Sequence, residues 1–293
     1  MNNAFWFELE RRIQKIDSDF NLQHQQSVGG GSINRCYKLS GIKQHYFLKL
    51  RQANQTDLFS AETAGLTELH RSQTLRTPKP LLNGLIDEQR FLLLEFINFD
   101  SCRGDQRQLA TQLVQLHRQS ATQFGWQKNN HIGATVQQNQ QQNDWLTFWR
   151  EQRLGFQLKL AAQNGHRGIV QELGAELSEK IPHFFANHQP QASLLHGDLW
   201  AGNVAYAKGQ PVIFDPAVYY GDRETDLAMT ELFGGFSAEF YAAYQHHWPL
   251  DEGYSVRKIL YNLYHILNHL NLFGGSYRAQ AENMMQTLLA EVR

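Results

Sequence analysis

The sequence predicts an α+β fold in two lobes, a small one rich in strands followed by a larger one that is mainly helical. Two observations support this division. Strand-like alternation dominates the chain up to Phe99, whereas helical spacing of apolar residues dominates after it. With 293 residues, the chain is long enough for two lobes that each bury a core. We therefore expect one lobe over residues 1–97 and the other over 98–293, with the junction between Glu95 and Asp100.

The small lobe is predicted to begin with a helix and to hold five strands around a second helix. Over residues 4–16, helical spacing predicts an apolar face made of Phe5, Leu9, Ile13 and Ile16. The remaining predicted segments are two short strands flanking a run of three glycines, a strand over 45–51, a helix over 58–72, and two strands within 77–97 that meet at a turn around residues 87–88. In the strand over 45–51, Lys49 points away from the face of Tyr46, Leu48 and Leu50.

The larger lobe is predicted from amphipathic patterns. In its last helix, over residues 257–273, one buried face is expected from Ile259, Leu263, Ile266 and Leu270. Further helices are predicted over residues 106–120, 145–162 and 169–185. The glutamine-rich stretch 136–144 has no apolar period, and we interpret it as a surface loop or a fraying helix start.

Composition excludes several partners. The formal net charge is −1, so the chain lacks the basic excess typical of proteins that bind nucleic acids or membrane surfaces. No apolar run approaches the length of a membrane helix, and the first residues do not resemble a secretory signal. The two cysteines, Cys36 and Cys102, match no zinc motif, and we expect reduced thiols in a cytoplasmic protein, with Cys36 buried in a strand. The pattern indicates no particular oligomeric state.

Residues of the small lobe are candidates for binding phosphates. The glycine run continues through Gly30, Gly31, Ser32, Ile33 and Asn34, where backbone N–H groups could approach an anion closely. Lys49 follows on a strand and Glu62 on the next helix, which is how protein kinases hold nucleotide phosphates. Alternatively, the glycines form a hairpin turn, Lys49 is solvated and Glu62 is an exposed helix charge.

The larger lobe contains a spaced set of polar residues. His196, Gly197 and Asp198 are followed by Asn203, five residues after the aspartate, and Asp215 comes twelve residues later. Protein kinases use this spacing for a carboxylate beside the attacking hydroxyl and two oxygen ligands for Mg²⁺, although they have arginine where Gly197 stands. A single such aspartate could be a turn residue, but the ordered set favours phosphoryl transfer. Between the lobes, Glu95, Phe96 and Ile97 are candidates to bind adenine through backbone groups.

Three segments carry a family resemblance. Residues 196–203, 214–236 and 29–39 resemble the fructosamine/ketosamine kinase family, within the aminoglycoside phosphotransferase and choline kinase group. The resemblance covers essentially the whole chain. It implies a bilobal protein-kinase-like fold and ATP-dependent, Mg²⁺-assisted phosphorylation of a sugar hydroxyl, usually O3, on a free or protein-bound ketosamine, such as a ribulosamine, erythrulosamine or fructosamine. The phosphorylated adduct would then decompose and free the amine, a form of protein repair.

The resemblance also implies roles for individual residues. Asp198 is the catalytic base or orients the hydroxyl, Asn203 and Asp215 hold Mg²⁺, Lys49 and Glu62 manage the α- and β-phosphates, and the backbone from Gly30 to Asn34 covers them. His196 is expected to brace the loop of residues 196–203, which we call the catalytic loop. The candidates for residues that lie near the substrate or brace the catalytic loop are Trp200, Asp222, Glu224 and Asp226, and we favour the bracing role for Asp226.

Two alternatives remain. One is another small-molecule kinase of the same group, acting on an aminoglycoside, choline, homoserine or methylthioribose. The other is a catalytically inactive nucleotide-binding module. Such modules usually lose the lysine, the catalytic aspartate or a metal ligand, and all of these are present in the sequence. A cellular role in antibiotic resistance also stays open at this point.

Overall fold

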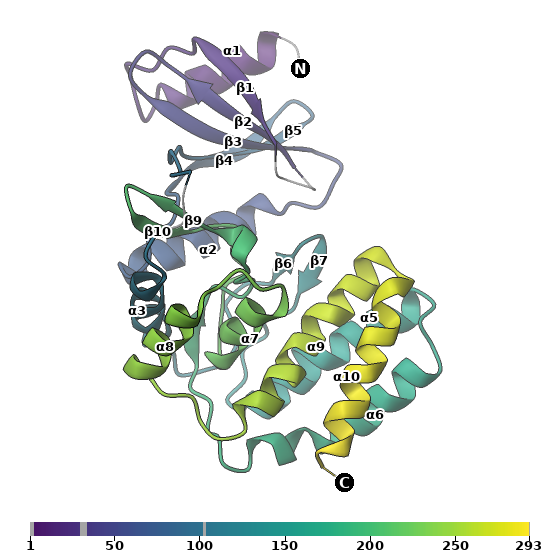
Figure 1. The fold of residues 1–293 in the computed structure, drawn as a ribbon. Coiled ribbons are helices and arrows are strands. Elements are labelled where there is room, and N and C mark those ends of the chain that lie inside the picture. The colour runs from purple at the N-terminus through teal and green to yellow at the C-terminus, as the bar shows by residue number, and fades with distance from the viewer. Residues whose placement is uncertain (1–2, 30–33, 102–103, 293) are drawn as a thin grey trace.

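The computed structural model describes residues 3–29, 34–101 and 104–292 (Figure 1). Its small lobe holds one antiparallel sheet in the order β1-β2-β3-β5-β4. The strands are β1 His24–Val28, β2 Arg35–Ser40, β3 His45–Gln52, β4 Pro80–Ile86 and β5 Gln89–Glu95. Helices α1 (Asn3–Ile13) and α2 (Phe59–Ser72) cover its two faces, in agreement with the predicted element order.

The two faces of β3 have different surroundings, as the alternation predicts. Leu48 and Leu50 are buried in the core that α1 covers, and Tyr46 packs against that core. Lys49 and Phe47 point the other way, toward α2 and the larger lobe. The predicted opening helix is shorter than expected, because it ends at Ile13 and a turn follows, which leaves Ile16 49% exposed.

The larger lobe is built around α9 (Tyr254–Phe273), which packs against α5, α7 and α10 (Figure 1). As predicted, Leu263, Ile266 and Leu270 are fully buried, whereas Ile259 is half-buried at the edge of the core. The other helices are α3 Gln106–His117, α4 Trp145–Phe148, α5 Phe156–Gln163, α6 Ile169–Lys180, α7 Glu224–Leu232, α8 Ala238–His247 and α10 Arg278–Ala290. A π-helical turn, Trp149–Gly155, links α4 to α5.

Three pairs of short strands carry the irregular parts of the larger lobe. They are β6 Asn130–Ile132 with β7 Thr135–Gln137, β8 Ser193–Leu195 with β11 Tyr219–Gly221, and β9 Val204–Ala207 with β10 Gln210–Ile213. The pairing of β8 with β11 brings the segment after Asp215 back beside the segment before Asp198. This register places the two polar motifs next to each other.

The glutamine-rich stretch is not a surface loop throughout. Gln137 and Asn139 are 1% and 0% exposed, respectively. The amide of Gln137 donates to Asn130 Oδ1 and to the carbonyl of Ala217, both at 2.9 Å. The prediction was wrong for these residues because side-chain amides can be buried when every polar atom finds a partner, which composition does not reveal.

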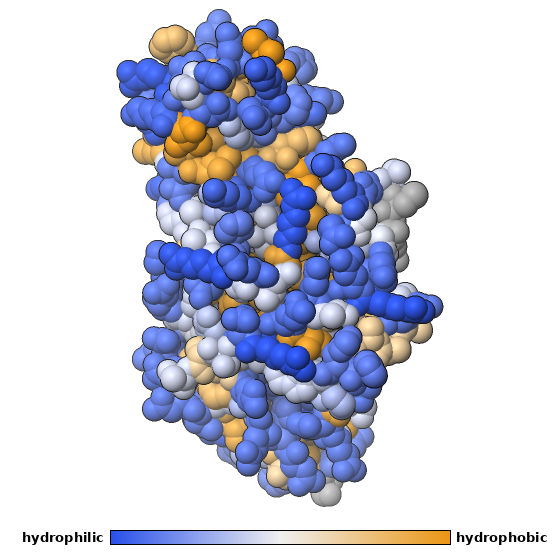
Figure 2. Space-filling view, turned by 90° about the vertical axis from the view of Figure 1, so that its left-hand side faces the viewer, coloured by the Kyte–Doolittle hydropathy of each residue, from blue (hydrophilic) through white to orange (hydrophobic). Residues whose placement is uncertain are grey.

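Figure 2 shows a largely hydrophilic face, with apolar side chains gathered below the upper lobe, where it meets the larger one. Among the described residues, no helix combines the length and apolar character that a membrane span requires.

Candidate active site

A cavity of about 1030 Å³ lies between the two lobes. Most of the predicted site residues line it, from both lobes. They are Asn34, Lys49, Glu62, Glu95, Phe96, Ile97, Asp198, Trp200, Asn203 and Asp215. Of the predicted phosphate-covering backbone, residues 30–33 lie outside the described part of the chain, and so does Cys102. Cys36 also lines the cavity, and it is buried in β2 as expected.

Lys49 joins the two lobes. Its Nζ lies 2.6 Å from Glu62 Oε1 on α2 and also donates to Asp215 from the larger lobe. Burial alone would lower the pKa of Lys49, but the carboxylates of Glu62 and Asp215 outweigh it and raise the pKa far above its ordinary value. The alternatives of a solvated Lys49 and an exposed Glu62 are therefore wrong, since their side chains are only 8% and 13% exposed.

Asp198 and Asn203 are held together on the catalytic loop. The amide nitrogen of Asn203 donates to the backbone carbonyl of Asp198 at 2.9 Å and to its Oδ2 at 3.3 Å. Burial, assisted by the negative charge of Asp215, raises the pKa of Asp198 to about 7. A carboxyl with a pKa near neutrality is suited to accept a proton from a hydroxyl group.

Gly197 explains why this loop lacks the arginine of protein kinases. Its φ is +81°, in the left-handed region, and a Cβ there would lie 2.1 Å from the carbonyl oxygen of Ala217. The close approach arises because the Ala217 N–H donates to the carbonyl of His196 at 2.9 Å. Only glycine fits a backbone that is both left-handed and this crowded.

His196 and Asp226 brace the loop. The Nε2–H of His196 donates to the carbonyl of Phe214 at 3.0 Å, while its Nδ1 accepts from the N–H of Asp198 at 3.2 Å. Burial lowers the pKa of His196, in agreement with this neutral form. Asp226 accepts from the backbone N–H groups of His196 and Gly197, both at 2.8 Å. Its Oδ2 also lies 3.2 Å from Nε2 of the buried His117.

Asp215 presents its carboxylate to the cavity from an unusual backbone conformation. Its φ is +56°, which is sparsely populated for residues other than glycine and is found at functional sites. The side chain is 51% exposed, and its neighbour Phe214 is anchored by donating its N–H to the carbonyl of Asn203 at 3.1 Å. The backbone thus directs Asp215 toward Lys49.

The side-chain oxygen atoms in the cavity are suitable ligands for a magnesium ion. Mg²⁺ prefers hard oxygen ligands from one or two protein groups and completes its shell with water and phosphate oxygens. Asp215 supplies a carboxylate, and Asn203, whose nitrogen is used by Asp198, offers its amide Oδ1. These are the two residues that the motif predicts.

The segment between the lobes combines apolar surface with backbone groups. Phe96 and Ile97 line the cavity just after β5 ends at Glu95. The carboxylate of Glu95 is paired with Arg76 at 2.8 Å, so it adds no unpaired negative charge to the cavity. Phe99 stacks on Phe214 with ring centroids 5.4 Å apart. Flat apolar walls of this kind suit a purine ring.

Three of the predicted substrate residues do not line the cavity. Asp222, Glu224 and Asp226 are 1%, 0% and 2% exposed. Asp226 accepts from the backbone of the catalytic loop, which is the bracing role favoured for it, and the other two are bound to buried partners away from the loop. Asp222 lies 2.6 Å from Nε2 of His188, and Arg257 binds both carboxylate oxygens of Glu224 at 2.7 and 2.9 Å. The physical reason is charge pairing, since a buried carboxylate is stable only with such partners. Trp200 alone among the four lines the cavity.

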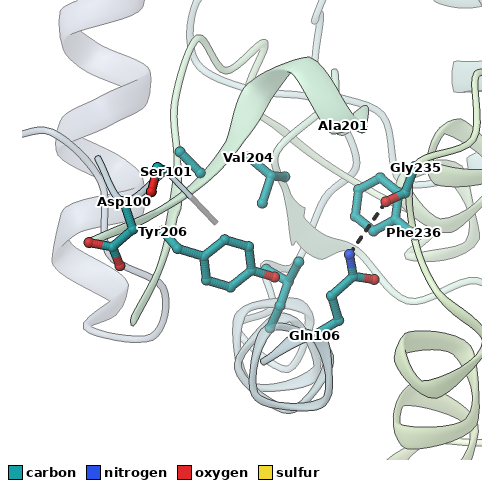
Figure 3. A pocket seen from close by; sticks show the side chains of 10 residues that line it. Asp100, Ser101, Gln106, Ala201, Val204, Tyr206, Gly235 and Phe236 are labelled. Atoms are coloured by element: carbon teal, nitrogen blue, oxygen red, sulfur yellow. Dashed lines mark hydrogen bonds between the residues drawn. The ribbon is translucent and has the colours of Figure 1, made fainter. Parts of the chain in front are cut away.

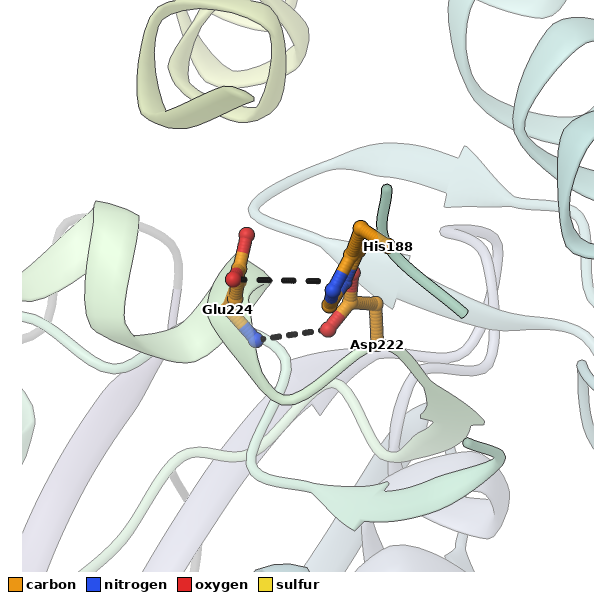
Figure 4. Close-up of side chains that lie close together, drawn as sticks. All are labelled: His188, Asp222 and Glu224. Carbon is orange, nitrogen blue, oxygen red and sulfur yellow. Dashed lines mark hydrogen bonds and ion pairs between the residues drawn. The ribbon is translucent and has the colours of Figure 1, made fainter. Parts of the chain in front are cut away.

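Figure 4 shows how His188, Asp222 and Glu224 converge. Their potential ligand atoms lie within 4.8 Å of one another, close enough for a metal ion. However, His188 also contacts Asp251 through its other nitrogen, and Arg257 neutralises Glu224. The cluster is a network of paired charges within the larger lobe.

The sequence reasoning missed the hairpin formed by β6 and β7. Its residues Asn130, His131 and Gly133 line the cavity between the lobes. Asn130 donates to the carbonyl of Val218 at 2.7 Å and thereby ties the hairpin to the segment after Asp215. The sequence holds no signal for this contact, because the strands have only three residues each.

A second, smaller cavity of about 200 Å³ lies near the end of the catalytic loop (Figure 3). Ala201, Val204 and Tyr206 are among the residues that line it. Gln106, at the start of α3, reaches across and donates to the carbonyl of Gly235 at 3.4 Å. None of the predicted site residues lines it.

The two lobes and the groups between them define a phosphotransferase with a kinase-like fold. Solved structures agree with the fold. One is a Haemophilus somnus 129PT protein assigned as a fructosamine-3-kinase, with a TM-score of 0.87, 26% identity, and coverage of 97% of this chain and 98% of that one. Another is aminoglycoside phosphotransferase APH(4)-Ia in a complex with AMP-PNP and hygromycin B, with a TM-score of 0.66 and 14% identity over 97% and 98% of the two chains.

Sequence comparison identifies the family. The family model for fructosamine kinase matches residues 6–291, and the chain belongs to that family. A "probable ketoamine kinase" of Synechocystis sp. is 45% identical, with 98% of this chain and 97% of the relative covered. A chloroplastic protein-ribulosamine 3-kinase of Arabidopsis thaliana is 39% identical, with 90% and 82% covered. The chain is therefore an ATP-dependent phosphotransferase that acts on a sugar hydroxyl.

Proposed function

We propose that this enzyme uses Mg·ATP to phosphorylate O3 of ketosamines, with ribulosamines and erythrulosamines preferred over fructosamines, and so starts the removal of the sugar from an amine. The observation that carries the proposal is the convergence of Asp198, Asn203, Asp215 and Lys49 on one cavity. Relatives named as ketoamine and ribulosamine kinases support the substrate class. We place the enzyme in the cytoplasm, where the thiol of Cys36 would stay reduced.

In phosphoryl transfer, the protein contributes mainly by positioning the reactants and by neutralising charge. Asp198 accepts a hydrogen bond from the O3 hydroxyl and takes its proton as the bond between O3 and the γ-phosphorus forms. The bond between the γ-phosphorus and the bridging oxygen breaks, and ADP leaves. Lys49, oriented by Glu62, binds nucleotide phosphate oxygens. Asp215 and Asn203 would hold Mg²⁺, which would neutralise charge on the phosphates when bound. His196 and Asp226 keep the loop in place while the acceptor binds.

An assay of ADP release tests this function. The acceptors are the ribulosamine, erythrulosamine and fructosamine adducts of free lysine, compared with aminoglycosides. We expect turnover on the ketosamines and none on the aminoglycosides. The proposal fails if an aminoglycoside is the better acceptor, or if no acceptor increases ADP release.

The variant Asp198→Asn tests the role of the carboxylate. We expect kcat on the best ketosamine to fall by about 10²-fold or more, because an amide cannot take the proton. Binding of ATP should stay nearly intact. Asp19→Asn, an exposed aspartate of the small lobe, is the matched control and should keep full activity. Unchanged turnover in Asp198→Asn would show that Asp198 is not the base.

A further inference from the structure

A row of aromatic side chains leads from the cavity onto the larger lobe. It starts at Trp200, which lines the cavity two residues after Asp198 and is 39% exposed. The ring is seated on the catalytic loop, since a Cβ at Gly202 would come within 2.2 Å of it. The ring of Phe233, at the end of α7, lies 6.3 Å from that of Trp200. The row therefore begins beside the catalytic aspartate.

The row continues across α9, which packs beside α7. The His269 ring lies 5.4 Å from Phe233, 5.5 Å from Phe273 and 5.1 Å from Tyr277. Phe233 and Phe273 are 47% and 67% exposed. We refer to Trp200, Phe233, His269, Phe273 and Tyr277 as the aromatic ledge. His269 and Tyr277 are half-buried between the exposed rings, and Trp200 is the member that lines the cavity. Single exposed aromatic residues are common, but a connected row that starts in a site and reaches the surface indicates a ligand surface.

The carboxylates that line the cavity, among the described residues, all have other roles, so none is free to pair with a positively charged amine of the substrate. Among the described residues that line the cavity, Glu62 is paired with Lys49 and Glu95 with Arg76. Asp198 and Asp215 stand where the hydroxyl and the phosphates meet. The three further candidate carboxylates, Asp222, Glu224 and Asp226, are buried with other partners. A ketosamine carries a secondary ammonium next to its sugar, so another group must recognise this cation.

The faces of aromatic rings can recognise an ammonium cation. A cation over an aromatic ring is attracted by the ring's negative face, and quaternary and alkylated ammonium groups are bound in this way. His269 adds a directed contact. Its Nδ1–H donates to the carbonyl of His265 at 2.7 Å, so in the neutral ring Nε2 bears a lone pair that can accept from an ammonium N–H. Both features fit an alkylated ammonium with a carbon chain.

We propose that the aromatic ledge is the subsite for the amine half of the substrate, namely the secondary ammonium and the alkyl chain to which the sugar is attached. This inference rests on the proposed function, since it assumes that the sugar hydroxyl lies at Asp198. The ledge then selects acceptors by the charge of their nitrogen. It also explains how a protein-bound lysine adduct could be accepted, because the ledge is open to solvent along Phe233 and Phe273.

The test compares two acceptors that share one sugar. One is the ribulosamine of lysine, and the other is its N-acetylated form, whose nitrogen carries no charge. In Phe233→Ala and Phe273→Ala we expect KM for the charged acceptor to rise about three- to tenfold, with kcat and the KM for ATP unchanged. The preference for the charged acceptor should shrink by the same factor. Phe233→Leu, which keeps apolar area but loses the ring, should behave like Phe233→Ala.

Phe7→Ala is the matched control, since Phe7 is 70% exposed on α1 of the small lobe and should change neither constant. Calorimetric binding of a 3-deoxy ribulosamine separates the inference from the proposed function, because that compound cannot be phosphorylated at O3. Weaker binding of it to Phe233→Ala supports the ledge even if no acceptor is turned over. Equal binding to the wild type and both alanine variants overturns the inference even if the wild type is an active ketosamine kinase.

Discussion

The carboxylate of Asp226 accepts a hydrogen bond of 2.8 Å from the backbone N–H of Gly197, the residue immediately before Asp198. The other oxygen of Asp226 binds the N–H of His196 and lies 3.2 Å from His117. Burial opposes the charged form of Asp226, but the hydrogen bond from His117 and the neighbouring donors hold its pKa below its ordinary value. Asp226 is thus a positioning residue beneath the loop.

Replacing Asp226 with asparagine should disturb this support. The amide NH₂ would best replace Oδ1, where the single hydrogen bond from Gly197 is lost and the NH₂ group faces that N–H donor to donor. We expect the free energy of unfolding to fall by about 2–4 kcal/mol, and kcat to fall while the KM for ATP stays close to normal. Urea unfolding and steady-state kinetics measure the two effects. A variant with normal stability and normal kcat would show that Asp226 does not position the loop.

Gly197→Ala should destabilise the protein much more than an alanine at another glycine whose backbone is in the left-handed region. Gly209 provides the matched control, because its φ is +75° and no atom lies within 4 Å of its hypothetical Cβ. We expect Gly209→Ala to cost about 1–2 kcal/mol from backbone strain alone. Gly197→Ala meets the same strain and the carbonyl of Ala217, so it should cost clearly more and also reduce kcat. Equal losses of stability in the two variants would contradict the crowding seen at Gly197.

Asp215→Ala should impair the binding of Mg·ATP itself. The variant removes a carboxylate that would hold Mg²⁺ and also leaves Lys49 with Glu62 as its only anionic partner among the pairs described. We expect the affinity for ATP in the presence of Mg²⁺ to fall by tenfold or more, while the affinity measured with EDTA changes little. Titrations with and without the metal measure this difference. An identical response to Mg²⁺ in wild type and variant would argue against Asp215 as a ligand.

The His188–Asp222 pair should make stability depend on pH. Burial alone would lower the pKa of His188, but its hydrogen bonds to Asp222 and Asp251 outweigh this and raise the pKa above its ordinary 6.5. The stabilisation from protonated His188 is therefore complete below pH 6.5 and is lost as the pH rises through the raised pKa. For Asp222, buried but hydrogen-bonded to His188 and Tyr261, the pKa is lowered, so its contribution is lost only in acid.

Thermal unfolding of wild type and His188→Asn across pH 5 to 9 checks this expectation. The Tm of the wild type should exceed that of the variant most at the acidic end of this range. This difference in Tm should narrow as the pH rises above about 6.5. A gap that grows with pH would mean that His188 is neutral in the folded protein. His166→Asn, at a histidine outside the cluster, controls for general effects of the substitution.

The sequence by itself determined the order of elements in the small lobe and the phosphoryl-transfer chemistry of the cavity. Alternation in one strand placed Lys49 opposite Leu48 and Leu50, and the structure confirms these faces. The spacing of Asp198, Asn203 and Asp215 indicated phosphoryl transfer, and the three side chains line one cavity. These predictions succeed because periodicity and motif spacing depend on neighbours along the chain, which a sequence displays directly.

Only the tertiary structure decided which polar groups line the cavity and which are bound elsewhere. Glu224 pairs with Arg257, 33 residues away, and Asp226 contacts His117, 109 residues away. The aromatic ledge likewise joins the catalytic loop to the ends of α7 and α9. A local pattern cannot show such partners, because a buried charge or an exposed ring is explained by groups that folding brings from distant parts of the chain.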